Sequence, residues 1–172
     1  PDPELGDLYW VTHARTGSQG VDLFVPSAAM GMVWDKLCLA VRSLGGRPVG
    51  WSAFDLARIE AGIPRFGVDI DESHLPPEAG LDRNGISYTK GCYIGQETIA
   101  RIRTYGQVTK ALRGLRFEPN AALPARGDKI LHQGREVGSL TSVMQSPRCG
   151  GPIDLGYVRK ERNAPGTGLV VR

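Results

Sequence analysis

The sequence contains few cysteines and lacks the common motifs of metal and nucleotide sites. Its three cysteines are widely spaced and form no Cys-x-x-Cys pair, so they predict neither a disulfide framework nor a self-contained zinc site. Such cysteine use favours a reducing compartment, and we expect a cytoplasmic protein. There is no apolar run of membrane-spanning length and no signal-peptide pattern, so we expect no membrane partner. H-E-x-x-H, a Walker loop and G-x-G-x-x-G after a strand are absent as well.

The charge balance is too even to indicate a nucleic-acid partner by itself. The 172 residues include 21 basic and 18 acidic side chains, for a formal charge of +3. Six basic residues nevertheless fall within one stretch, and most of them are expected to form a solvated face. The alternative is a cationic rim around an anionic ligand, such as a polyglutamate tail or a phosphate backbone. The six are Lys90, Arg101, Arg103, Lys110, Arg113 and Arg116.

The first half of the chain alternates strand and helix signals. Residues 8–11 and 21–25 predict an antiparallel strand pair, because a turn-forming Thr-Gly-Ser-Gln-Gly segment joins them. Apolar residues at helical spacing predict a helix that starts at Ser27 and ends before Gly45. A return strand over 47–51 and a short helix capped by Ser52 follow. This order predicts an α+β sandwich with one covered sheet.

The second half has a different character. An irregular stretch over 64–85 is long enough to be a functional loop or an interdomain passage, and residues 96–103 predict about two turns of helix. Five short alternating segments between Gly, Pro or Asn then predict a small antiparallel β-barrel. They are 111–117, 129–132, 136–143, 153–158 and 168–171. We place the domain boundary near Gln107, which gives an α+β domain over 1–107 and a barrel domain over 108–172.

The segment Lys90–Glu97 is the strongest candidate site. Cys92 lies between two glycines, follows a lysine and precedes a predicted helix; a thiol in such a place is expected to ionise readily, and the thiolate binds metals or attacks electrophiles. Tyr93 could stack on a flat heterocycle, while Gln96 and Glu97 could hydrogen-bond its edge. Glu97 would also complement the helix dipole. We therefore predict a site around Cys92 rather than a buried, inert thiol.

The other reactive side chains carry weaker signals. No nucleophilic triad is visible, and the scattered His13, His74 and His132 are expected to be structural or solvent-facing. Asp22 on the second predicted strand faces either a cavity or water, and its spacing alone favours water.

The string Lys90–Glu97 resembles the signature of the YgfZ-type folate-binding proteins, which are relatives of the glycine-cleavage T-protein, an aminomethyltransferase. Five further segments resemble that family: 58–64, 67–70, 75–78, 138–147 and 155–158. The resemblance implies a ferredoxin-like α/β sandwich followed by a GcvT-like C-terminal barrel. Family members are about twice this long, so it also implies that the N-terminal domain, which carries the catalytic aspartate of true aminomethyltransferases, is missing here.

The resemblance also assigns residues. Asp22 matches the carboxylate that binds the pterin ring in T-proteins, whereas an assisting T-protein arginine falls on Phe54, which cannot donate hydrogen bonds. The implied cofactor is tetrahydrofolate, held by Asp22, Lys90, Tyr93, Gln96 and Glu97. Cys92 would be the working thiol and the ligand of a transient iron–sulfur cluster shared with another protein, because a cluster usually needs four protein ligands.

Three functions are considered, of which the first two follow from this resemblance and the third from the basic stretch. The first is a tetrahydrofolate-binding, non-enzymatic accessory factor for iron–sulfur cluster assembly or repair, with assembly proteins, cluster enzymes and tRNA-modifying enzymes as partners. The alternative is a tetrahydrofolate-dependent aminomethyltransferase or other one-carbon transferase. The third is a module whose basic stretch contacts tRNA, for which steep salt dependence is expected.

Overall fold

A computed structural model describes residues 5–82, 84–106 and 108–172. The chain divides into two compact units, Pro1–Ile63 and Pro64–Arg172, and each is described by itself. The expected domain boundary at Gln107 lies outside the described residues and stays a prediction. Helices and antiparallel strands occur together, which confirms the α+β class. No helix in the described ranges is long and apolar enough to cross a membrane.

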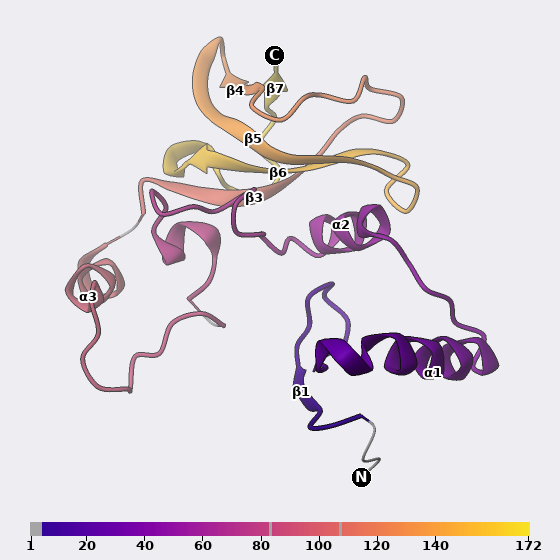
Figure 1. The fold of residues 1–172 in the computed structure, drawn as a ribbon. Coiled ribbons are helices and arrows are strands. Elements are labelled where there is room, and N and C mark those ends of the chain that lie inside the picture. Colours follow the sequence, from indigo (N-terminus) through magenta and orange to yellow (C-terminus); the bar gives the residue numbers. More distant parts are fainter. Residues whose placement is uncertain (1–4, 83, 107) are drawn as a thin grey trace. The chain divides into compact units, whose positions relative to one another are not determined.

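The first unit begins with the expected hairpin. Strands β1 (Tyr9–Thr12) and β2 (Val21–Phe24) pair antiparallel, with Val11 opposite Asp22. The His13 N–H donates to the carbonyl oxygen of Gly20 at 2.9 Å and so closes the ladder next to the turn. Asp22 and the segment that connects the two strands therefore belong to one hairpin, whose first strand, β1, is labelled in Figure 1.

Two helices follow the hairpin. A 3-10 turn over Ser27–Ala29 leads into α1 (Met30–Ser43), so the helix that we expected after Ser27 is confirmed. Gly45 then adopts a φ of 78°, which suits glycine at the end of a helix. The second helix, α2, spans Trp51–Glu60.

The expected return strand over 47–51 is wrong. Residues 47–50, all of them described, form no helix or strand, and α2 already begins at Trp51. Pro48 cannot donate to a strand ladder, which disfavours a paired strand at this place. The helix start is also displaced from the prediction: Gly50, in an extended conformation, is the N-cap residue, and Ser52 lies inside the helix.

The second unit opens with a long connection. Its only regular elements within the described residues 64–95 are the 3-10 turn η2 (Pro76–Ala79) and an isolated bridge between Phe66 and Ile70. Helix α3 (Gln96–Tyr105) follows and confirms the helix expected over 96–103. The irregular character of this connection agrees with its content of Pro, Asp and Glu. Part of the connection lies along the sheet that follows it in the chain (Figure 1).

A five-stranded antiparallel sheet forms the rest of the second unit. Its order is β3-β6-β5-β4-β7, and all five strands overlap the segments that the sequence predicts. Their bounds are β3 Lys110–Arg116, β4 Lys129–His132, β5 Arg135–Ser146, β6 Gly151–Arg159 and β7 Val170–Val171. The core cluster consists of Ile130, Val137, Leu140 and Val158, each at most 8% exposed.

Two local features shape the contact between β5 and β6. A Cβ atom at Gly138 would lie 1.9 Å from the carbonyl oxygen of Tyr157, so only glycine permits this close approach of the two strands. The register then shifts between Leu140 and Ser142, which leaves Thr141 as the extra residue of a β-bulge. Both features lie on the wall of the cavity described below.

Asp154 in β6 is a buried carboxylate without a partner. Its exposed fraction is 1%, and neither carboxylate oxygen has a hydrogen-bond partner within the described part of the chain. Burial, and secondarily the charge of Asp128, raises the pKa of Asp154 from 3.8 to about 7. The folded state therefore holds a proton that the unfolded chain releases at lower pH, so ionisation of Asp154 destabilises the fold.

Asp154→Asn is expected to stabilise the protein in a pH-dependent manner. Wild-type stability should fall as the pH rises from about 4 to about 7, the interval between the unfolded and folded pKa values of this group. The neutral amide avoids this loss, so the variant should gain about 1–3 kcal/mol over wild type at pH 8 and much less at pH 5. Urea unfolding at both pH values measures the difference. An equal difference at pH 5 and pH 8 would contradict the assignment.

Candidate functional site

The loop before α3 carries the exposed thiol. Cys92 is exposed, and Lys90 Nζ lies 4.9 Å from the centroid of the Tyr93 ring in a cation–π contact. The Lys90 backbone N–H donates to Ser87 Oγ at 3.3 Å. A positive side chain and an aromatic ring therefore lie on either side of Cys92 in sequence, and they contact each other.

Gln96 and Glu97 belong to the first turn of α3. Gly95 precedes the helix with a φ of 87°, a value that glycine adopts without strain. Gln96 Oε1 accepts a hydrogen bond from the Tyr93 N–H at 3.3 Å, so this side chain holds the loop against the helix start. Glu97 is exposed in the same turn, where a negative charge complements the helix dipole. The interpretation that both side chains bind the edge of a ligand stays a prediction.

The basic stretch is spread over several elements of the second unit. Arg103 in α3 stacks on the Tyr88 ring, with its guanidinium carbon 4.1 Å from the centroid. Arg113 and Arg116 project from β3, and they donate to the Asn163 carbonyl and to Cys149 Sγ, respectively, both at 3.0 Å. Lys110 lies at the start of β3 and lines a cavity. Several side chains of the basic stretch therefore contact other residues of the same unit.

Asp22 in the first unit is held by an arginine from the β1–β2 connection. Arg15 Nε lies 2.8 Å from both carboxylate oxygens, and Arg15 Nη2 lies 2.6 Å from Oδ2. These hydrogen bonds, followed by the charge of Arg15, lower the pKa of Asp22 below its ordinary value. The Asp22 side chain is 27% exposed. The structure thus presents an ionised, oriented carboxylate that solvent and ligands can still reach.

The predicted site residues therefore fall into two groups. Asp22 belongs to the first unit. The other five lie together in the second unit, namely Lys90, Cys92, Tyr93, Gln96 and Glu97. Among the described residues, no group of three or more His, Cys, Asp or Glu side chains could hold a metal ion. A cluster ligand role for Cys92 would thus need ligands from another protein.

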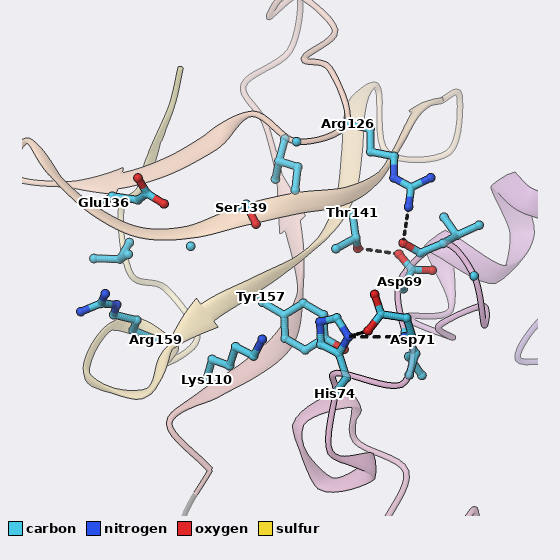
Figure 2. A pocket seen from close by; sticks show the side chains of 17 residues that line it. Asp69, Asp71, His74, Lys110, Arg126, Glu136, Ser139, Thr141, Tyr157 and Arg159 are labelled. Carbon is cyan, nitrogen blue, oxygen red and sulfur yellow. Dashed lines mark hydrogen bonds and ion pairs between the residues drawn. The ribbon is translucent and has the colours of Figure 1, made fainter.

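A cavity in the second unit was not predicted. It has a volume of about 390 Å³ and lies between the segment 67–74 and the strands of the sheet. Figure 2 shows Asp69, Asp71 and His74 on one side of it, with Lys110 and Arg159 on the other side of Tyr157. Arg126 donates to the carbonyl oxygen of Val68 at 2.8 Å and links the two walls.

Asp69 fastens the segment 67–74 to the sheet. Only 1% of Asp69 is exposed, and its Oδ1 accepts hydrogen bonds from the hydroxyls of Thr141 at 2.5 Å and Ser142 at 2.6 Å. Its Oδ2 accepts from the Arg65 N–H at 2.9 Å. Charge-assisted bonds of this kind are stronger than neutral ones, so the wall of the cavity is fixed by one carboxylate.

Tyr157 forms the middle of the cavity. Its ring stacks on His74 with centroids 4.5 Å apart, and Lys110 Nζ lies 4.8 Å from the same ring. His74 Nδ1 is 2.7 Å from Asp71 Oδ1, which fixes the imidazole. Two Ser73 hydrogen bonds and this contact lower the pKa of Asp71 to about 2. His74, which the sequence predicts to be structural or solvent-facing, thus contacts a buried tyrosine at the cavity.

Sequence patterns gave little indication of this cavity. Its residues come from five separate segments, and only contacts between distant parts of the chain bring them together. One signal was available: Lys110 and Arg159 are basic residues that directly flank two of the alternating segments, 111–117 and 153–158. The pairing that makes them neighbours could not be derived from the sequence.

Comparisons with known proteins agree with the fold. Residues 11–85 match the GCVT N-terminal domain, and residues 110–172 match the glycine cleavage T-protein C-terminal barrel domain. The chain resembles a crystal structure of the glycine cleavage system aminomethyltransferase T from Bartonella henselae with a TM-score of 0.81. That match covers 97% of this chain and 46% of the other at 23% sequence identity, so it supports the fold alone.

Several curated relatives are named aminomethyltransferases. One from Halothermothrix orenii is 31% identical over 91% of this chain and 43% of its own length. One from Saccharopolyspora erythraea is 34% identical over 91% of this chain and 42% of its own length. The chain therefore spans less than half the length of these relatives.

Both halves of the chain thus match domain models of one protein class, the glycine cleavage T-proteins. The chain is GcvT-like, with a T-protein-type barrel domain at its C-terminal end. The narrower resemblance to the YgfZ-type proteins stays a prediction.

Thiol labelling should single out Cys92. Cys92 is exposed, whereas Cys38 and Cys149 are half-buried and Cys149 Sγ contacts Arg116. Iodoacetamide should therefore modify Cys92 first in the native protein, and all three thiols in urea. Peptide mapping by mass spectrometry at several time points measures the order. Native labelling of Cys38 or Cys149 ahead of Cys92 would contradict the exposed position of the loop.

Proposed function

We propose that this chain takes part in tetrahydrofolate-dependent one-carbon transfer of the aminomethyl type. The observation that carries the proposal is its similarity to proteins named aminomethyltransferases, at 31–34% identity over about nine-tenths of the chain. This evidence favours the transferase alternative over the iron–sulfur role that the Lys90–Glu97 string suggests. Because the chain spans less than half of those relatives, the substrates and the complete reaction belong to the proposal.

The geometry of Asp22 supports a folate-binding role. A pterin ring presents N–H donors along one edge, and an ionised carboxylate is a strong acceptor for them. Asp22 is a carboxylate at neutral pH, and the hydrogen bonds from Arg15 lower its pKa further. A carboxylate has about four acceptor positions, so the Arg15 fork leaves room for a ligand on the exposed side. We propose that Asp22 accepts hydrogen bonds from the pterin ring.

One difference between this chain and the T-protein pattern concerns the arginine that assists the carboxylate. The position of the assisting T-protein arginine is Phe54, whose ring instead packs edge-on against Trp51 with centroids 5.5 Å apart. Here the guanidinium comes from the β1–β2 connection and reaches the same kind of carboxylate from the hairpin itself. We propose that Arg15 positions Asp22 in place of the arginine that Phe54 replaces.

Asp22→Asn is expected to weaken tetrahydrofolate binding. The amide keeps the shape but loses the charge, which should cost about 1.5–3 kcal/mol, or roughly 10- to 100-fold in Kd. Arg15→Lys keeps a positive charge but loses the fork, so it should weaken binding less than Asp22→Asn. Anaerobic isothermal titration calorimetry with tetrahydrofolate measures the three affinities.

Asp35→Asn is the matched control, because Asp35 is an exposed carboxylate on α1 of the same unit. It should bind tetrahydrofolate like the wild type. Equal affinities for wild type and Asp22→Asn, or no binding by the wild type, would overturn the proposal. Folate-dependent release of ammonia from an aminomethyl donor would extend it from binding to transfer.

An accessory role in iron–sulfur cluster assembly or repair is the second candidate. The observation that favours it is the exposed Cys92 beside the Lys90–Tyr93 pair. A thiol so placed could supply one ligand of a cluster shared with an assembly protein or a cluster enzyme, including tRNA-modifying enzymes. Tetrahydrofolate would then bind the same protein without being transformed.

Cys92→Ser separates the two functions. The variant should bind tetrahydrofolate like the wild type, because Cys92 is not a pterin contact in the transferase proposal. If the accessory role holds, cells with Cys92→Ser as the only copy should lose activity of cluster-dependent tRNA-modifying enzymes. Enzyme activity equal to that of wild-type cells would exclude the accessory role and leave the transferase proposal intact.

A further inference from the structure

We propose that Tyr9 and Phe24 form a platform on which the pterin ring of tetrahydrofolate stacks, while Asp22 accepts hydrogen bonds from the edge of that ring. The ligand is the one of the proposed function, so the platform rests on the proposed tetrahydrofolate-dependent transfer. It adds two binding residues that neither the sequence patterns nor the resemblance to the T-proteins assigns. All three side chains belong to the hairpin of the first unit, whose first strand is labelled in Figure 1.

The register of the hairpin places the three side chains on one face. Phe24 lies two residues after Asp22 in β2, and side chains at alternate positions of a strand point to the same face. Tyr9 is the direct partner of Phe24 across the ladder, so it lies on that face as well. Two residues span roughly 7 Å along a strand, which is comparable with the length of a bicyclic ring. A ring whose edge reaches Asp22 can therefore lie against Phe24 and Tyr9.

The two aromatic side chains are accessible to a ligand. Tyr9 is 65% exposed and Phe24 is 56% exposed. Val11, which lies directly opposite Asp22, adds a third apolar side chain to the same face and is 51% exposed. Exposed apolar surface that is contiguous and bordered by polar groups is typical of a ligand or interaction site. The hairpin thus presents an apolar surface around one oriented carboxylate.

The opposite face of the hairpin lacks the charged group. Trp10 is 70% exposed on that face, but Asp22 is the only carboxylate in residues 9–12 and 21–24, all of which are described. Arg15 holds this carboxylate with hydrogen bonds of 2.6–2.8 Å and so fixes its orientation. Within the two strands, only the Asp22 face therefore combines an aromatic surface with a charged acceptor for N–H donors.

A pterin ring matches both parts of this face. One edge of the ring carries N–H donors, which an ionised carboxylate accepts strongly. The flat face of the ring has no such donors, and flat heterocycles bind aromatic side chains by stacking. Asp22 would fix the edge and thereby the orientation of the ring, and the Tyr9–Phe24 pair would contribute affinity through its face. The glutamate tail needs no contact on this face of the hairpin.

Anaerobic titration calorimetry with tetrahydrofolate tests the platform on the purified chain. Phe24→Leu and Tyr9→Leu should each raise Kd roughly 2- to 10-fold, because each variant removes one ring from the stack. Phe24→Tyr keeps an aromatic ring at the same position and should bind like the wild type. This recovery would show that the loss in Phe24→Leu comes from the missing ring rather than from a misfolded hairpin.

Trp10→Leu is the matched control. Trp10 lies between Tyr9 and Val11 in β1 and therefore points to the opposite face of the hairpin. The substitution removes an exposed aromatic ring from the same strand as Tyr9 and should leave Kd unchanged. If Trp10→Leu weakens binding as much as Phe24→Leu, the effect is a general one on the hairpin, and the platform is wrong.

The remaining outcomes separate the platform from the proposed function. If Asp22→Asn weakens binding while Phe24→Leu and Tyr9→Leu bind like the wild type, the folate site stands and the platform is overturned. If Tyr93→Leu weakens binding and Phe24→Leu does not, the stacking ring belongs to the second unit, and the platform is overturned as well. If the wild type does not bind tetrahydrofolate, the proposed function and the platform fail together.

Discussion

One buried carboxylate holds the second unit in its observed form. Asp69 receives hydrogen bonds from two hydroxyls of β5 and from a backbone N–H of its own segment. A charge with 1% exposure is tolerated only when donors replace the lost water. These hydrogen bonds therefore hold the segment 67–74 against the sheet. The cavity lies between this segment and the sheet. The unpartnered Asp154 in the same sheet shows the opposite case, since burial there is relieved by protonation.

Much of the fold could be predicted from local patterns. The five strands of the second unit were recognisable because apolar residues alternate between Gly, Pro and Asn, and α1 because its apolar residues recur at helical spacing. The wrong strand expected over residues 47–51 has a local cause. The segment has an apolar pattern, but Pro48 cannot donate to a strand ladder, and Gly50 is the N-cap residue of α2. Register, by contrast, depends on pairing between distant segments, which no local pattern contains.

The candidate sites divide in the same way. The Cys92 segment was found because its chemistry lies within eight consecutive residues, and the exposure of Cys92 agrees with that interpretation. Arg15 lies in the connection of a hairpin and Asp22 on its second strand, so their contact could be predicted only with the register of the two strands known. The sequence alone favoured a water-facing position for Asp22. The pair of Lys110 and Arg159 is separated by almost fifty residues and becomes visible only when β3 lies beside β6. Distance along the chain, rather than the type of residue, decided what could be foreseen.

The β-bulge in β5 has a consequence for how this region can change. In a regular strand, consecutive side chains point to opposite faces, so two successive hydroxyls could not reach a single oxygen. The extra residue at Thr141 removes that restriction and lets Thr141 and Ser142 share Asp69 Oδ1. Deleting one residue at this point would restore regular alternation while keeping the composition of the strand nearly intact. Related chains should accordingly tolerate substitutions here more readily than changes in length.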